Sequence, residues 1–209
     1  MPAADALIIR HLGQVDYETT WRGMQDFTQR RNDNTPDEIW FLEHPPVFTL
    51  GRNARQEYLH SRGKIPVLHV DRGGQVTYHG PGHRVVYTLL TINRRQLGVQ
   101  SLVRKLEQAV IDLCADHGVD AQRREKAPGV YVNGRKLAAL GLRVRKGCSF
   151  HGLSLNVDMD LAPFSMIDPC GYKGMEVTQL SNLGIDASTG TISEELQQHL
   201  ERLLKSPPT

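Results

Sequence analysis

The stretch VYVNGRKLAALGLRV, which covers residues 130–144, carries the strongest fold signal in the chain. Its Asn133-Gly134 pair stands between two runs of apolar and β-branched residues, and Asn-Gly suits the positive-φ positions of a type I′ turn. The stretch therefore predicts a β-hairpin with strands at 130–132 and 136–144. Residues 149–157 continue the pattern and predict another strand directly after the hairpin.

Six further strands are predicted upstream of the hairpin, at residues 6–12, 38–42, 47–50, 67–70, 75–78 and 85–92. The last of them is a nearly continuous apolar run, which suits a buried position in a sheet. Strands follow one another more often than they alternate with helices. This order favours an α+β fold with a mixed or antiparallel sheet flanked by helices.

Three helices are predicted around this sheet. Residues 17–31 show the one-sided apolar spacing of an amphipathic helix. Ser101 is the expected N-cap of a second helix, which we expect to end at Gly118. A capping box of Thr191 and Glu194 is expected to start the third.

Length and composition are those of one ordinary globular domain. The chain has 209 residues, of which 39% are hydrophobic and 23% are charged. That is enough to close a substantial core. We predict a single domain over residues 1–205 and a disordered tail at 206–209.

Charge and hydropathy argue against several classes of function. Lys plus Arg number 25 against 23 Asp plus Glu, whereas a protein that grips nucleic acid is normally strongly basic. Residues 1–9 show no basic leader with an apolar segment after it, and no run of about 18 apolar residues occurs. The three cysteines form no CxxC pair, so reduced thiols in a cytoplasmic protein are predicted rather than a disulfide scaffold.

Short basic clusters occur at residues 30–31, 94–95, 123–126 and 143–146. Solvated faces and strand edges explain them, and so does a docking surface for an acidic partner. Composition alone does not choose between the two.

A glycine-rich run, RGGQVTYHGPGH at residues 72–83, is the first candidate site. Gly73 and Gly74 let backbone N–H groups approach a ligand closely, and the Arg72 guanidinium supplies a rigid donor fork beside them. A strand with a turn at each end also explains the run. It matches neither a GxxxxGK[ST] phosphate loop nor a GxGxxG motif.

Histidine spacing within this run does not predict a metal site. Gly80-Pro81-Gly82 separates His79 from His83, so the two rings do not share one helix face. We expect His79 to hydrogen-bond a substrate carbonyl or the local backbone, and we predict no cofactor.

Lys136 is a candidate base because it opens a strand of small and apolar residues. Ala139 and Gly141 would let an acyl group or another chain lie close to it. In a site of low dielectric constant a lysine gives up its proton more readily. The alternative is a surface lysine whose ammonium group reaches water.

Cys170 is the best candidate nucleophile among the three thiols. It lies between Pro169 and Gly171 in a stretch without helix or strand periodicity. Cys114 continues the apolar stripe of the second predicted helix and is expected to be packing. Cys148 follows what looks like an exposed turn.

Four ordered blocks of the chain, residues 72–82, 136–141, 151–158 and 169–171, together with 49–53, resemble the lipoyl(octanoyl) transferase family. The resemblance implies the α+β fold that this family shares with biotin and lipoate ligases. It also implies transfer of an octanoyl group from acyl carrier protein to a lysine of a lipoyl domain, without ATP. The implied acceptors are the lipoyl domains of 2-oxoacid dehydrogenases and the glycine cleavage H protein.

The resemblance also implies which residues act. The family's catalytic cysteine and lysine fall on Cys170 and Lys136. One departure is His83, because the family usually shows Gln after His-Gly-Pro-Gly; His83 adds a titratable group near the site. The family's substrate-contacting residues fall on Arg72, Gly73, Gly74, Gln75, Val76, Thr77, Tyr78, His79, Ala139, Leu140, Gly141, Gly152, Leu153 and Ser154.

We expect Lys136 to take the proton of the Cys170 thiol, or to pair with its thiolate, so that the sulfur attacks the carrier thioester. Backbone N–H groups of the Cys170-Gly171 turn or of Gly73-Gly74 are expected to stabilise the oxyanion.

Three alternatives remain open. An ATP-dependent lipoate or biotin ligase on the same fold would adenylate its acid and keep its activity in Cys170→Ala. A non-catalytic acyl-binding or partner-binding module would form no covalent adduct. A metal hydrolase that used His79, His83 and His151 would hold zinc.

Overall fold

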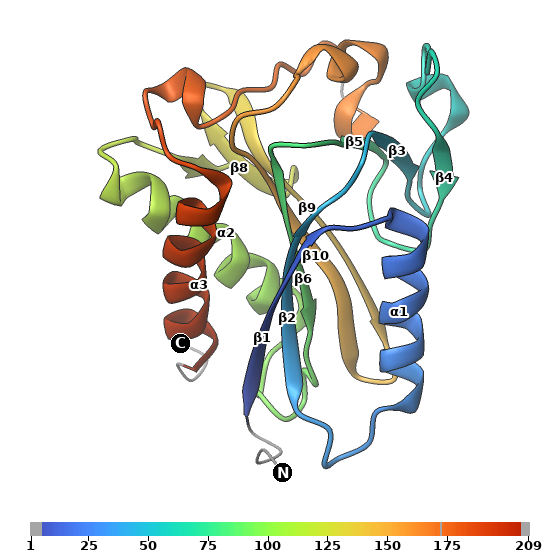
Figure 1. The fold of residues 1–209 in the computed structure, drawn as a ribbon, viewed down its shortest axis with the longest axis vertical. Coiled ribbons are helices and arrows are strands. Elements are labelled where there is room, and N and C mark those ends of the chain that lie inside the picture. Colours follow the sequence, from blue (N-terminus) through green and yellow to red (C-terminus); the bar gives the residue numbers. More distant parts are fainter. Residues whose placement is uncertain (1–5, 172, 206–209) are drawn as a thin grey trace.

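The computed structural model describes residues 6–171 and 173–205, apart from the side chain of Cys170, and centres on a seven-stranded sheet (Figure 1). Only the β1–β2 pair is parallel, and every other neighbouring pair of this sheet is antiparallel. The mixed sheet predicted from the sequence is therefore confirmed. From one edge to the other the strands are β1 (Leu7–Gln14), β2 (Asp37–Glu43), β6 (His83–Leu89), β10 (Cys148–Asn156), β9 (Arg135–Arg145), β8 (Gly129–Val132) and β7 (Gln122–Arg123).

The predicted hairpin forms the β8–β9 pair. Asn133 and Gly134 join the strands with φ angles of 50° and 79°, as a type I′ turn requires. Among the strands of the described residues, the sequence missed only β7, which has two residues and is too short to show a pattern.

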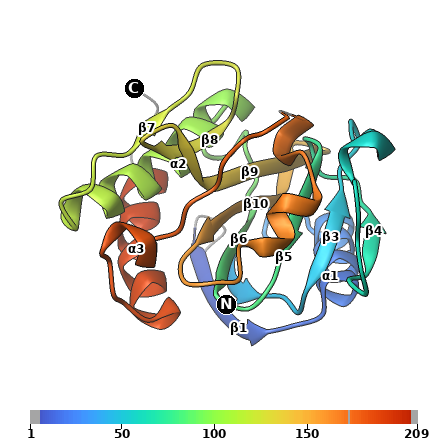
Figure 2. The same cartoon turned by 90° about the horizontal axis from the view of Figure 1, so that it is seen from above.

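A second, three-stranded sheet lies on one side of the large one (Figure 2). Its strand order is β4 (Val67–His69), β3 (Val47–Leu50) and β5 (Val76–His79). Helix α1 (Tyr17–Arg30) lies on this same side, whereas α2 (Val99–Asp116) and α3 (Thr189–Lys205) cover the opposite face of the large sheet.

Both expected serine and threonine caps are wrong by about one helical turn. Helix α2 starts after Gly98, which has no side chain to cap it, so that Ser101 lies inside the first turn. Helix α3 starts at Thr189, and the Ser188 hydroxyl oxygen accepts a hydrogen bond from the Thr191 N–H at 3.1 Å. A polar residue inside a first turn resembles a cap in sequence, because both positions favour the same residue types.

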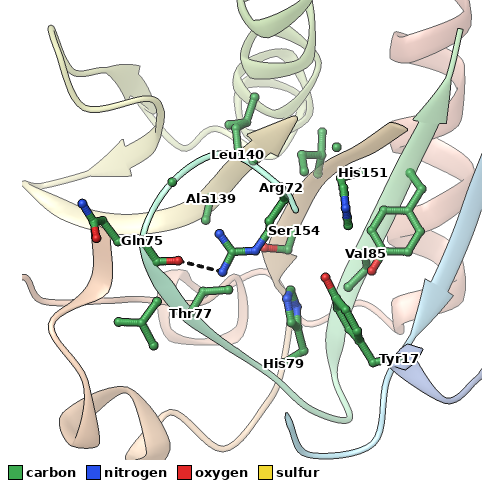
Figure 3. Close-up of a pocket in the computed structure, with 16 residues that line it drawn as sticks. Tyr17, Arg72, Gln75, Thr77, His79, Val85, Ala139, Leu140, His151 and Ser154 are labelled. Atoms are coloured by element: carbon green, nitrogen blue, oxygen red, sulfur yellow. Dashed lines mark hydrogen bonds between the residues drawn. The ribbon is translucent and has the colours of Figure 1, made fainter. Parts of the chain in front are cut away.

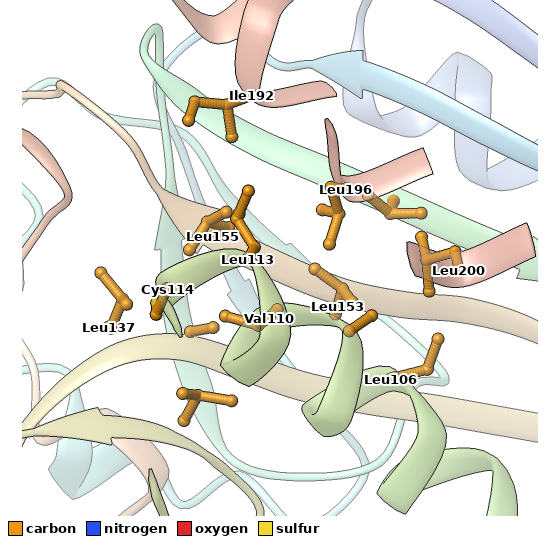
Figure 4. Close-up of a cluster of buried hydrophobic side chains, with 14 of the residues drawn as sticks. Leu106, Val110, Leu113, Cys114, Leu137, Leu153, Leu155, Ile192, Leu196 and Leu200 are labelled. Carbon is orange, nitrogen blue, oxygen red and sulfur yellow. The ribbon is translucent and has the colours of Figure 1, made fainter. Parts of the chain in front are cut away.

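The main core lies between the large sheet and the α2–α3 layer (Figure 4). Leu106 and Leu113 of α2, Leu196 of α3 and Leu155 of β10 are completely buried there. Burying each such side chain contributes about 1.5–3 kcal/mol. The core holds β9 and β10 firmly, and these strands carry part of the candidate site.

A smaller apolar cluster fixes the chain around residue 170. Phe48 and Tyr78 of the small sheet pack against Phe164 and Ile167. These contacts anchor the 3₁₀ helix η2 (Ala162–Met166), which is followed closely by η3 (Pro169–Gly171).

No helix within residues 6–171 and 173–205 is long and apolar enough to cross a membrane. The tail predicted at residues 206–209 lies outside the described residues.

Candidate active site

A cavity lies between the small sheet and the large sheet (Figure 3). The structure brings all of the predicted substrate-contacting residues to its wall except Gly73 and Tyr78. We call this space the acyl cavity, because most of its surface is apolar. It is lined by Tyr17, Arg72, Gly74, Gln75, Val76, Thr77, His79, Val85, Tyr87, Ala139, Leu140, Gly141, His151, Gly152, Leu153 and Ser154.

Strand alternation explains how β5 serves both the cavity and the core. Thr77 and His79 point toward the cavity, as Figure 3 shows. Tyr78 points the other way and packs on Phe48 and Phe164, with ring centroids 5.5 and 5.7 Å apart. Side chains two residues apart on a strand share a face. Tyr78 is therefore a core residue rather than a lining residue.

Arg72 holds the wall of the cavity together. Its guanidinium donates to Thr49 O at 2.7 Å, to Gly73 O at 2.9 Å and to Gln75 O at 2.9 Å. The residue is 8% exposed. The glycine-rich run predicted that Arg72 offers a donor fork to a ligand; in the structure these bonds tie strand β3 to the glycine-rich loop.

Gly141 allows that loop to cross β9. A Cβ atom at this position would lie 3.0 Å from Gly73 O and 3.3 Å from Arg72 Cδ. The Gly73 N–H, in turn, donates to Leu142 O at 2.9 Å. The loop therefore continues the edge of the sheet and closes one side of the cavity.

Tyr17 and His79 line the acyl cavity, and the His44 and His83 rings pack against His79. His79 lies 5.5 Å from Tyr17, 5.8 Å from His44 and 5.1 Å from His83, measured between ring centroids. Burial lowers the pKa of His44 to about 4 and that of His83 to about 3, and it holds the pKa of His79 well below its usual range. These rings are neutral at pH 7. Neither ring nitrogen of His79 has a hydrogen-bond partner among the described residues.

His151, which lines the acyl cavity, contacts the Asp71 carboxylate. His151 Nε2 lies 3.1 Å from Asp71 Oδ1, which also accepts a hydrogen bond from Trp21 Nε1 at 2.7 Å. Burial by itself raises the pKa of Asp71, but the hydrogen bonds from His151 and Trp21 outweigh it and lower this pKa to about 2. Burial lowers the pKa of His151 despite its acidic partner.

His79, His83 and His151 do not form a metal site with other side chains. In the part of the chain that the structure describes, no group of three or more His, Cys, Asp or Glu side chains is arranged to hold a metal ion.

A second, smaller cavity adjoins the acyl cavity, and we call it the lysine cavity. Thr77, Ala139 and Ser154 line both spaces. Lys136 lies in its wall together with Pro169. Lys136 is 3% exposed, so the alternative of a surface lysine is wrong.

Gly129 gives Lys136 the room that it occupies. A Cβ atom on Gly129 would lie 2.7 Å from Lys136 Cε and 3.3 Å from its Nζ, and the φ angle of 146° also favours glycine. The Gly129 N–H donates to Glu107 Oε1 at 2.9 Å, and Glu107 Oε2 accepts from Arg123 Nε at 3.1 Å. A buried carboxylate on α2 thus fixes the backbone against which the lysine lies.

Cys170 lies in the 3₁₀ helix η3, directly after Pro169 of the lysine cavity. Its side chain lies outside the described residues, so the predicted meeting of its sulfur with the Lys136 nitrogen stays a prediction. The next residue, Gly171, has a φ angle of 74°. A Cβ atom on it would lie 3.4 Å from Gln75 Cγ.

The other two cysteines are buried. Cys114 is packing, as predicted, and burial raises the pKa of its thiol to about 12. Cys148 is 6% exposed, although sequence analysis placed it beside an exposed turn. Its pairing with Arg145 in the β9–β10 hairpin turns it inward.

Two of the N–H groups expected to bind an oxyanion already have partners. The Gly73 N–H donates to Leu142 O, and the Gly171 N–H donates to Asp168 O, both at 2.9 Å. The expectation is therefore wrong for these two groups.

Sequence reasoning missed several residues of the two cavities. Tyr17 and Tyr87 come from α1 and β6, and their patterns show only apolar packing. Glu107 holds the backbone N–H of Gly129, and Gly129 packs against Lys136; no sequence motif predicts these contacts. The sequence shows only that a glycine directly precedes a predicted strand.

Comparison with known proteins identifies the class. Residues 16–201 match the family model described as the lipoyl protein ligase A/B catalytic domain. In fold, the chain is similar to a bi-partite lipoate protein ligase from Thermoplasma acidophilum, with a TM-score of 0.77, 16% identity, and coverage of 96% of this chain and 84% of the other. It is also similar to a biotin protein ligase from Aquifex aeolicus, with a TM-score of 0.61, 13% identity, and coverage of 95% and 70%.

Curated relatives narrow the class further. An octanoyltransferase of Nitrosococcus oceani is 56% identical over 201 residues, which cover 96% of this chain and 90% of that protein. An octanoyltransferase of Laribacter hongkongensis is 54% identical over 199 residues, which cover 95% and 96%. The chain therefore belongs to the lipoyl protein ligase A/B family and, within it, to the octanoyltransferases, which are acyltransferase enzymes. The family and the fold expected from the resemblance are confirmed.

Proposed function

We propose that the chain transfers an octanoyl group from acyl carrier protein to a lysine of a lipoyl domain, through a thioester on Cys170. The observation that carries this proposal is the position of Lys136. Its side chain is buried in the lysine cavity beside Pro169, and that space adjoins the acyl cavity at Thr77, Ala139 and Ser154. Cys170 follows Pro169 directly in the chain, which supports pairing it with Lys136.

In the first half-reaction Lys136 acts as the general base that takes the proton of the Cys170 thiol. The thiolate attacks the carbonyl carbon of the octanoyl thioester. The carbon–sulfur bond to the carrier breaks, and the departing sulfur takes the proton back from Lys136. One thioester replaces another, so the step is close to balanced in energy.

In the second half-reaction the amine of the acceptor lysine attacks the octanoyl carbonyl on Cys170. Lys136 accepts a proton from the attacking nitrogen and passes it to the sulfur as the carbon–sulfur bond breaks. An amide and a free thiol result, and the enzyme returns to its starting state without ATP.

Apolar lining of the acyl cavity supports an acyl substrate. Val85 and Ala139 line the space, and most of the cavity surface is apolar; the polar side chains of its wall include Thr77 and Ser154. Apolar pockets with a few fixed polar groups are typical of small-molecule sites. The acceptors that we propose are lipoyl domains of 2-oxoacid dehydrogenases and the glycine cleavage H protein, in the cytoplasm.

The test is the intact mass of the protein after mixing with octanoyl-acyl carrier protein. We expect one octanoyl adduct on the wild type and none on Cys170→Ser, whereas Cys148→Ser, which removes a different thiol, keeps the adduct. Lys136→Met should slow adduct formation by about 10²-fold or more, because it removes the general base. An adduct on Cys170→Ser would reject the proposed nucleophile. Activity that requires ATP and survives this change would identify a ligase instead.

A further inference from the structure

The lysine cavity and the acyl cavity follow one another along strands β6 and β10 of the large sheet. Three residue pairs of these strands line them, and the β6 members lie two residues apart, so their side chains share a face. In order along β6, the pairs are His83 with Asn156 in the lysine cavity, then Val85 with Ser154 and Tyr87 with Gly152 in the acyl cavity. Tyr87 is therefore the lining residue of β6 that lies farthest from the lysine cavity.

Close-packed side chains follow Tyr87 along the same face of β6. Tyr87 and Leu89 belong to one apolar cluster with Met24 of α1 and Phe150 of β10, and all four are buried. Tyr17, the first residue of α1, lines the acyl cavity as well. The cavity therefore ends where the packing between α1 and the large sheet begins.

Tyr17 lies on the far side of the acyl cavity from the chain around residue 170. A Cβ atom on Gly171 would lie 3.4 Å from Gln75 Cγ, so Gln75 marks the near side. Figure 3 shows Gln75 and Tyr17 at opposite sides of the cavity. The two tyrosines thus lie at the end of the cavity that is remote from the proposed nucleophile.

A hydrogen bond holds the Tyr87 ring in place. His44 Nδ1 lies 2.7 Å from Val15 O, and a carbonyl oxygen only accepts, so Nδ1 carries the proton. Burial lowers the pKa of His44 to about 4, so the ring is neutral at pH 7 and Nε2 is an acceptor. The Tyr87 hydroxyl therefore donates to His44 Nε2 at 2.8 Å. Tyr17 packs on the same imidazole, with ring centroids 4.7 Å apart.

The length of the two cavities along β6 suits an acyl chain of medium length. From the His83 pair to the Tyr87 pair the strand advances by four residues, which is about 13 Å. An extended alkyl chain advances about 1.3 Å per carbon–carbon bond, because the bonds are about 1.5 Å long and meet at about 111°. An octanoyl chain therefore spans about 9 Å and a dodecanoyl chain about 14 Å.

We propose that Tyr17 and Tyr87 set the upper length of the acyl chain that the enzyme transfers, by closing the acyl cavity beyond the eighth carbon. This inference rests on the proposed function, because it takes the acyl carbonyl to lie at the lysine cavity. An octanoyl chain that starts there ends short of the tyrosine rings. A dodecanoyl chain would have to displace a ring that is hydrogen-bonded to His44 and backed by packed side chains.

The test compares the rates at which octanoyl- and dodecanoyl-acyl carrier protein acylate the protein, followed by intact mass. We expect the wild type to form the octanoyl adduct about 100-fold faster. Tyr87→Leu and Tyr17→Leu each replace a ring by a shorter side chain and should lower this ratio about tenfold or more. Tyr78→Leu is the matched control, because its ring faces Phe48 and Phe164 instead of the cavity, and it should keep the wild-type ratio even if both rates fall.

Three results would overturn the inference. They are equal wild-type rates with the two donors, a wild-type ratio in both leucine variants at positions 17 and 87, and a ratio that falls as far in Tyr78→Leu as in those variants. Octanoyl adduct formation by a wild type without length preference would leave the proposed function standing. A wild type that forms no adduct even with the octanoyl donor would reject the proposed function itself.

Discussion

Replacing His83 by glutamine should flatten the loss of stability that the protein suffers on acidification. His83 is 1% exposed in the wall of the lysine cavity, and its Nδ1 has no hydrogen-bond partner among the described residues. Burial, and to a lesser degree the nearby ring of His44, lowers its pKa to about 3. In the unfolded chain an imidazole has a pKa of about 6.5.

Stability falls as the pH falls because the folded and unfolded chains protonate His83 at different pH values. Between pH 6.5 and pH 3 the unfolded chain binds a proton at this position and the folded chain does not, so stability falls as the pH falls. Stability from the neutral ring is fully present above pH 6.5. At pH 5 the loss due to His83 alone amounts to about 2 kcal/mol, whereas at pH 8 it is close to zero. That is a large part of the 5–15 kcal/mol that typically separates folded and unfolded states.

The assay is urea unfolding at pH 8, 6.5 and 5, followed by far-UV circular dichroism. Between pH 8 and pH 5 the free energy of unfolding of His83→Gln should fall by about 2 kcal/mol less than that of the wild type. His69→Gln, at an exposed position on β4, is the matched control and should keep the fall of the wild type. Comparing changes with pH removes any constant effect of the substitution. Equal slopes in His83→Gln and in the wild type would refute the reasoning.

Two further predictions concern the support of Lys136. Gly129→Ala should destabilise the fold by about 2–4 kcal/mol, because its Cβ would lie 2.7 Å from the backbone oxygen of Ala138, and it should abolish most of the acyl transfer, because the same Cβ would lie 2.7 Å from Lys136 Cε. Gly134→Ala, with a positive φ but no atom within 4 Å, should cost only about 1 kcal/mol and keep the activity. Glu107→Ala leaves the buried Gly129 N–H without an acceptor and should cost about 1–3 kcal/mol by thermal unfolding, whereas Glu107→Gln keeps an acceptor oxygen and should cost less. Stability that is equal in Gly129→Ala and Gly134→Ala, or in the two Glu107 variants, would contradict these assignments.

Much of the fold follows from local pattern. Asn133-Gly134 fixes the hairpin because few residue pairs accept two consecutive positive φ angles. Alternation along residues 75–79 also predicts that two sets of side chains face opposite ways, although it does not say which set faces a cavity. Helix starts were less predictable, because Ser101 and Thr191 fit a first turn as well as a cap.

The candidate site follows from the sequence only in part. The family resemblance located the strand segments of the acyl cavity, because those motifs are continuous in sequence. Tyr17 reaches the same cavity from a helix more than fifty residues upstream of the glycine-rich run, and only the packing of α1 on the sheet brings it there. Glu107 contacts the site through the backbone N–H of Gly129, a contact that depends on tertiary structure alone.

The polar inner wall of the acyl cavity is compatible with an apolar tail only if its rings carry no charge. A charged imidazolium in such a place would lose most of its hydration, whereas a neutral ring loses far less. Burial lowers the pKa of His79 and that of His151, which are the two imidazoles that line the acyl cavity. These two rings are therefore uncharged at neutral pH. The proton transfers of the proposed reaction fall to Lys136 and Cys170 at the other end of the connected cavities.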